Sequence, residues 1–136
     1  MNSNLNNIAV YLLIIDDDPD DHFLLRKAID ASIPQAIVES LYDGSEALQF
    51  LENCTTLPNL IFLDLNMPVV SGSNTIKLIR EKEYLANLPI IVLTTSNNEK
   101  DRTESMRLGA SAFYSKPFNQ QDLVKIVEEV KEKWLK

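Results

Sequence analysis

The sequence predicts an α/β fold, a doubly wound sandwich in which a five-stranded parallel sheet carries helices on both faces. Two observations predict it. Short, continuously apolar runs recur along the 136 residues, and segments with helical periodicity separate them, so that strand and helix alternate five times. Continuous apolar runs suit strands buried on both faces. The alternation favours right-handed crossovers between parallel strands.

The expected strands follow from the apolar runs. Three runs are clear, at residues 9–15, 60–63 and 90–93, a fainter one covers 112–114, and a weaker stretch at 36–39 follows Pro34. The helices between them are marked by apolar positions at helical spacing: Leu24, Leu25, Ala28 and Ile29; Ala47, Leu48 and Leu51; Ile76 and Ile79 after Gly72; residues 99–108 before Gly109; and Leu123, Ile126, Val127 and Val130.

Two helix starts carry local signals. Asp43 to Glu46 has the spacing of a capping box with Asp in the place of Ser or Thr, and Asn119 is a good N-cap for the last helix. Trp134 and Leu135 lie past the apolar face of that helix. We expect them to pack against the rest of the domain, and the alternative is that they contact a partner protein.

Composition narrows the class of protein. Residues 1–136 are expected to form a single domain with a core at about 9–134 and no output domain. The net charge of -7 argues against direct nucleic-acid binding and makes a basic partner or a metal more plausible. The apolar stretch at 8–15 is too short to span a membrane, so cytoplasmic residence is the default. Cys54, the single cysteine, is expected to be a packed small hydrophobe.

Polar residues terminate the apolar runs. Asp16 and Asp17 follow the first, Asp64 follows 60–63, Thr94 follows 90–93 and Lys116 follows 112–114 after one serine. Parallel strands end on one edge, where open α/β sheets place their ligand sites, so these groups should converge. Three carboxylates together call for a divalent cation, and an all-oxygen set favours Mg²⁺.

With a metal, a hydroxyl and a lysine beside it, Asp64 has the surroundings of a phosphoryl-transfer nucleophile. Lys116 would neutralise phosphoryl oxygens, and Thr94 would hydrogen-bond one of them. His22, the only histidine, is expected to be a solvated helix residue rather than a ligand.

These motifs resemble the receiver domain of two-component response regulators. The resemblance rests on Asp16-Asp17, on LDLNMP around Asp64, on IIVLTTS around Thr94 and on SKPF around Lys116, and it covers residues 12–134. It implies a flavodoxin-like sheet with strand order 2-1-3-4-5. The TTS segment and the C-terminal KWL also resemble stand-alone regulators that serve phytochrome-type kinases.

The resemblance also implies residue roles. Asp64 would be the phosphoacceptor, taking its phosphoryl group from the phosphohistidine of a sensor histidine kinase or a histidine phosphotransfer protein. Mg²⁺ would be bound by Asp17, Asp64 and the backbone carbonyl of Asn66, with Asp16 acting through water. Asp18, Asp20 and Asp21 would lie outside the site, with Asp20 or Asp21 helping to start the first helix. Such a protein is a signalling phosphoacceptor rather than an enzyme, assisting only its own phosphorylation and dephosphorylation.

Thr94 and Phe113 would form the switch, reshaping a face made by residues 99–108, Phe113 and 119–130 for partner binding or for self-association as a homodimer. Phe113 stands where Tyr is frequent in the family, so a hydroxyl contact is lost. Thr95 is bulkier than the usual Ala or Gly and could narrow access to the phosphoryl group.

Three other functions share parts of this sequence pattern. IFLDLN resembles the opening of haloacid dehalogenase phosphatases, but Asn66 stands where that class needs its acid. A pseudo-receiver that binds partners without phosphorylation would be expected to lose key positions, all of which are present. Flavodoxin-like cofactor binding lacks a phosphate-cradling loop after the first strand.

Overall fold

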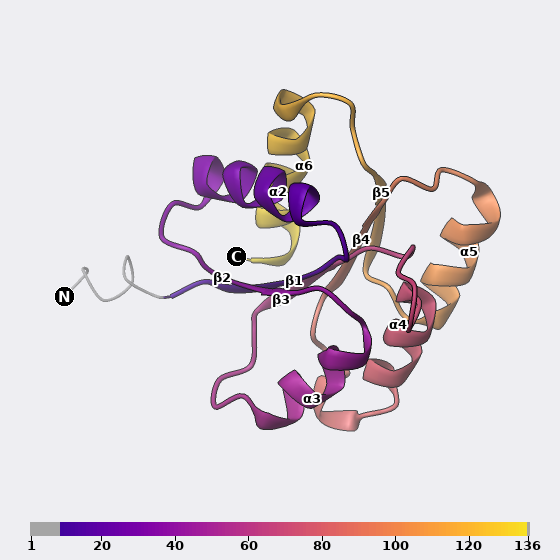
Figure 1. The fold of residues 1–136 in the computed structure, drawn as a ribbon. Helices are drawn as coiled ribbons and strands as arrows, with labels where there is room; N and C mark the ends of the chain where they lie inside the picture. The colour runs from indigo at the N-terminus through magenta and orange to yellow at the C-terminus, as the bar shows by residue number, and fades with distance from the viewer. Residues whose placement is uncertain (1–8, 136) are drawn as a thin grey trace.

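The computed structural model describes residues 9–135 (Figure 1). Five parallel strands lie in the order β2-β1-β3-β4-β5, which confirms the predicted fold class and strand order. The elements in chain order are β1 (Tyr11–Ile15), α2 (Pro19–Ser32), β2 (Ile37–Leu41), α3 (Ser45–Asn53), β3 (Leu60–Leu63), α4 (Gly72–Arg80), the short 3₁₀ helix η1 (Glu83–Leu85), β4 (Ile90–Thr94), α5 (Glu99–Leu108), β5 (Ala112–Ser115) and α6 (Gln120–Trp134).

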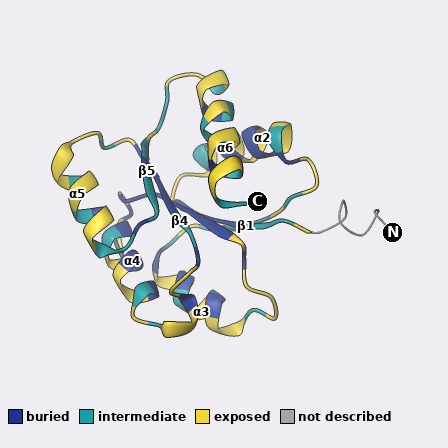
Figure 2. Cartoon of the chain, turned by 180° about the vertical axis from the view of Figure 1, so that it is seen from behind, coloured by how far each residue is buried: buried dark blue, intermediate teal, exposed yellow. Residues whose placement is uncertain are grey.

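The core lies in two layers, one on each face of the sheet. Helices α2 and α6 pack side by side on one face, and α3, α4 and α5 cover the other (Figure 1). The central strands are buried along their length (Figure 2), as their continuous apolar sequences predict. Trp134 and Leu135 pack against the α2–α6 layer, which confirms the prediction that they pack back on the body.

Side-chain caps set several helix starts. Asn119 accepts a hydrogen bond from the Asp122 backbone N–H, which confirms the predicted cap of α6. The predicted capping box at Asp43 is wrong. Its carboxylate accepts from the Ser45 N–H and its carbonyl from the Glu46 N–H, so Asp43 opens a turn two residues before the first helical residue, and Gly44 takes the cap position.

Strand β2 is one of the two edge strands of the sheet, and β5 is the other. The β2 residue Ile37 is largely exposed. The guanidinium of Arg26, from α2, lies along this edge and donates to the Val38 carbonyl at 3.0 Å and to the Ser40 hydroxyl at 2.9 Å. One outward-facing carbonyl of the edge strand is therefore already paired.

Helix α5 is the most weakly anchored helix by side-chain burial. Among its residues only Ser105 is buried, although Leu108 packs partly against the core. The helix stops at Gly109, as predicted, because that residue has φ 120°, a backbone conformation that favours glycine. Across residues 9–135, the structure contains no helix that combines the length and the apolar character needed to cross a membrane.

Candidate functional site

The backbone brings the polar residues that follow the strands to one edge of the sheet. Asp64 N–H donates to the Ile15 carbonyl at 2.9 Å, and Lys116 N–H donates to the Thr94 carbonyl at 2.7 Å. The β1–β3 and β4–β5 ladders thus continue for one residue past their strands. The predicted convergence of these side chains is observed.

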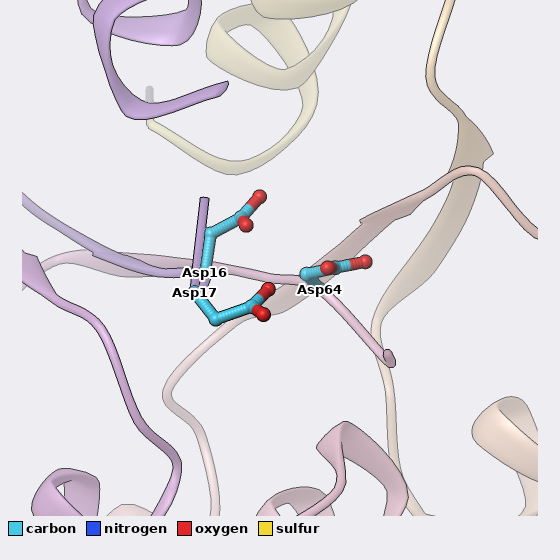
Figure 3. Close-up of side chains that lie close together, drawn as sticks. All are labelled: Asp16, Asp17 and Asp64. Carbon is cyan, nitrogen blue, oxygen red and sulfur yellow. The ribbon is translucent and has the colours of Figure 1, made fainter. Parts of the chain in front are cut away.

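Three carboxylates gather at the ends of β1 and β3. Asp16, Asp17 and Asp64 each offer an oxygen, and these atoms all lie within 4.8 Å of one another (Figure 3). Asp16 and Asp64 are buried, whereas Asp17 is exposed. Among the described residues, the buried Asp64 Oδ1 has no hydrogen-bond partner. A divalent cation would supply the missing charge, and oxygen donors suit a hard ion such as Mg²⁺.

The electrostatics of the cluster agree with that fit. Burial raises the pKa of Asp64 above its ordinary value, and Lys116 opposes the shift. Burial also raises the pKa of Asp16, opposed by the Asp18 N–H at 2.9 Å from its carboxylate and by Lys116. Both carboxylates are therefore costly to ionise in the folded chain without further positive charge.

Lys116 is the cation that faces this cluster. Its ammonium lies 2.9 Å from Asp16, 2.6 Å from Asp21 and 3.7 Å from Asp64. Burial lowers the pKa of Lys116, but hydrogen bonds to Asp21 and Asp16 outweigh it, so the pKa is raised overall. The expectation that Asp21 lies outside the site is wrong, because the first turn of α2 carries it against Lys116.

The other acidic residues of this loop act on the helix. Asp18 is the N-cap of α2, and its side chain accepts from the Asp20 N–H at 2.9 Å. Asp20 and Asp21 both lie in the first turn, where negative charge favours the helix dipole. The expectation that one of them helps to start the helix therefore agrees with their position.

Thr94, at the end of β4, is fully buried. Its hydroxyl accepts a long hydrogen bond from the Asn66 amide at 3.5 Å and another from the Ser96 N–H at 3.4 Å. Phe113 is buried in the layer of α3 and α4, with the Arg102 guanidinium 5.4 Å from its ring centroid. Thr95 is exposed.

His22 is not the solvated residue that we expected. Its side chain is buried, its Nε2 lies 2.7 Å from the Asp16 carbonyl oxygen, and its ring packs against Tyr42 with centroids 4.3 Å apart. Nδ1 is buried and finds no hydrogen-bond partner among residues 9–135, and a proton on Nε2 would donate to the Asp16 carbonyl. A sequence signal was available, because His22 lies three and seven residues before Leu25 and Ile29 on the buried face of α2.

The strand order of the sheet and the acidic cluster at the strand ends are together typical of one class of protein, the response regulator receivers. Residues 12–128 match the family described as "Response regulator receiver domain", and the chain belongs to that family. Receiver domains accept phosphoryl groups from sensor histidine kinases. The chain is thus a signalling protein of two-component systems, and not a phosphatase of the haloacid dehalogenase type.

Among its relatives, the chain is 32% identical to the response regulator Rcp1 of Synechocystis sp., over 98% of this chain and 94% of Rcp1. A crystal structure of the phosphorylated cyanobacterial phytochrome response regulator RcpA matches with a TM-score of 0.86 and 30% identity, covering 94% of this chain and 95% of RcpA. The Mn²⁺-bound form of Rcp1 matches with a TM-score of 0.82 and 32% identity, over 93% and 95% of the two chains.

Proposed function

We propose that Asp64 is the phosphoacceptor of this receiver and that the transfer depends on Mg²⁺. The observation that supports the proposal is the position of the Asp64 carboxylate. It is buried, it lies near Asp16, Asp17 and Lys116, and one of its oxygens has no hydrogen-bond partner among the described residues. A carboxylate oxygen of Asp64 attacks the phosphorus of a phosphohistidine. The phosphorus–nitrogen bond breaks, and the electron pair returns to the imidazole of the donor.

Asp16, Asp17, Asp64 and the backbone carbonyl of Asn66 would hold the ion. When bound, Mg²⁺ neutralises negative charge on the carboxylates and on the incoming phosphoryl group. The bound Mn²⁺ of Rcp1 and the phosphorylation of RcpA, both at high structural similarity, support this assignment. Lys116 and Thr94 would contact the phosphoryl oxygens, since both already face the carboxylate region.

The same proposal covers the response to phosphorylation. Thr94 and Phe113 would rearrange and change the face formed by α5, β5 and α6, because a new charge biases a packed element with two arrangements. A hollow on that face is lined by Arg102, Met106, Tyr114 and Trp134. It would bind a partner protein or a second copy of the chain.

The donor would be a sensor histidine kinase or a histidine phosphotransfer protein in the cytoplasm. A net charge of -7 makes direct contact with nucleic acid unfavourable. The chain would assist only its own phosphorylation and dephosphorylation, as a signalling phosphoacceptor.

Mass spectrometry of the intact protein and its peptides tests the proposal after incubation with acetyl phosphate and Mg²⁺. We expect a single phosphoryl adduct on Asp64, absent from Asp64→Asn and from metal-free samples. Absence of the adduct with acetyl phosphate and with a panel of histidine kinases would refute it and favour the pseudo-receiver.

A further inference from the structure

Lys116 has its shortest carboxylate contact with a residue that is neither a metal-ligand candidate nor the proposed phosphoacceptor. Its ammonium lies 2.6 Å from Asp21, compared with 3.7 Å from Asp64. Asp21 is outside the group of carboxylates that could hold an ion, which consists of Asp16, Asp17 and Asp64. Among the described residues, the Asp21 carboxylate forms its hydrogen bond and ion pair with Lys116.

Burial makes this contact consequential. Only 14% of the Lys116 side chain and 30% of the Asp21 side chain are exposed, so water screens the pair poorly. A charge-assisted hydrogen bond in such surroundings is stronger than an exposed surface pair. A cation bound by the acidic cluster would also interact with Asp16 and would weaken its bond to Lys116. Asp21 would then be the main carboxylate partner of the lysine.

We propose that Asp21 is a positioning residue that holds the Lys116 ammonium on the α2 side of the site and competes with the phosphoryl group on Asp64 for that ammonium. This inference rests on the proposed function of Asp64. In the unphosphorylated chain Asp21 and Asp16 hold the ammonium away from the phosphoacceptor. Once Asp64 carries a phosphoryl group, Lys116 can contact that group fully only by giving up part of its bond to Asp21. Asp21 therefore limits how strongly the phosphorylated state is stabilised.

The neighbouring residue offers a matched control. Asp20 lies in the same first turn of α2 and carries the same charge, but it is exposed and does not contact Lys116. Asp20→Asn and Asp21→Asn remove the same net charge and the same favourable interaction with the helix dipole. A difference between them isolates the contact with Lys116.

The experiment measures binding of beryllium fluoride, a mimic of the phosphoryl group, to the full chain in the presence of Mg²⁺. We expect Asp21→Asn to bind it about three- to tenfold more tightly than Asp20→Asn, which is less than a full charged hydrogen bond contributes, because Lys116 gives up only part of its bond to Asp21. In a Lys116→Gln background the two variants should bind equally, because the effect acts through the lysine.

Equal affinity of Asp21→Asn and Asp20→Asn, or weaker binding by Asp21→Asn, would overturn the inference. A difference that persists in the Lys116→Gln background would also overturn it. Acetyl phosphate labelling of the wild-type chain, read by mass spectrometry, separates the two levels. If the wild-type chain is labelled but Asp21→Asn binds beryllium fluoride no more tightly than Asp20→Asn, only this inference is refuted. If the wild-type chain is neither labelled nor binds beryllium fluoride, the proposed function is refuted and this inference with it.

Discussion

Gly72, the first residue of α4, allows the chain to pass against the end of β3. An added Cβ atom at this position would lie 2.3 Å from the Asp64 carbonyl oxygen and 2.5 Å from the Leu65 Cα. Both are backbone atoms at the strand end that carries the proposed phosphoacceptor. The Gly72 N–H also donates to the Leu65 carbonyl at 2.9 Å, so the two segments cannot separate without losing a hydrogen bond.

Gly72→Ala should therefore destabilise the protein, although Gly→Ala in a helix ordinarily stabilises it. Overpacking against rigid atoms costs about 1–3 kcal/mol. The gain in helix propensity offsets up to about 1 kcal/mol. Because the contacted atoms are backbone atoms, we expect a cost in the upper part of that range, about 2–3 kcal/mol. The net loss is then about 1–2 kcal/mol, which for a domain of this size lowers Tm by about 3–10 °C.

Thermal unfolding followed by circular dichroism measures the change, with Ser73→Ala, one residue further along α4, as the matched control. Because the clash also displaces the backbone at Asp64, labelling by acetyl phosphate should slow in Gly72→Ala. An unchanged or raised Tm for Gly72→Ala would refute the reasoning, since helix propensity alone would then decide the outcome.

Three further predictions follow from the same contacts. Burial raises the native pKa of Asp64 above its unfolded value, so the ionised carboxylate destabilises the folded chain at neutral pH. Asp64→Asn should therefore raise Tm by about 2–5 °C at pH 7. A Tm difference from wild type that does not shrink as the pH falls through the raised pKa would contradict this. His22→Phe keeps a ring but removes the donor to the Asp16 carbonyl, so urea unfolding should show a loss of about 1–3 kcal/mol; an unchanged midpoint would show that the bond contributes nothing. Phe118 is fully exposed two residues after Lys116 and offers an apolar contact to a protein that donates the phosphoryl group. Phe118→Ala should therefore slow phosphotransfer from a histidine kinase about tenfold. Equal slowing of labelling by acetyl phosphate would argue against a docking role.

The parts of the fold that the sequence predicted best are those buried on both sides. Strand β3 has the predicted bounds, and β4 extends only one residue further, because every residue of both strands is buried and apolar up to Thr94. Strand β2 lies at the edge and mixes exposed and half-buried residues, so its sequence IVESL lacks a continuous apolar run. Its observed bounds are accordingly shifted from the expected 36–39.

The site shows the same division. Asp16, Asp64, Thr94 and Lys116 could be found because each follows a recognisable strand, and parallel strands share one edge. The role of Asp21 could not be found in this way, because it depends on how α2 packs against the loop after β5. In the structure the amide of Gln120, the first residue of α6 directly after that loop, donates to the Leu24 carbonyl at 2.9 Å and joins this segment to α2. No local sequence pattern encodes such a contact.

The Arg26 guanidinium along β2 has a consequence for how copies of this chain can meet. An open sheet edge is a template on which a strand from another molecule can add, the first step towards continuous sheets between molecules. A strand added at this edge would have to displace the Arg26 guanidinium from the Val38 carbonyl and would leave the guanidinium without this hydrogen bond. Edge-to-edge pairing of two copies of the chain at β2 is therefore disfavoured at the Val38 carbonyl.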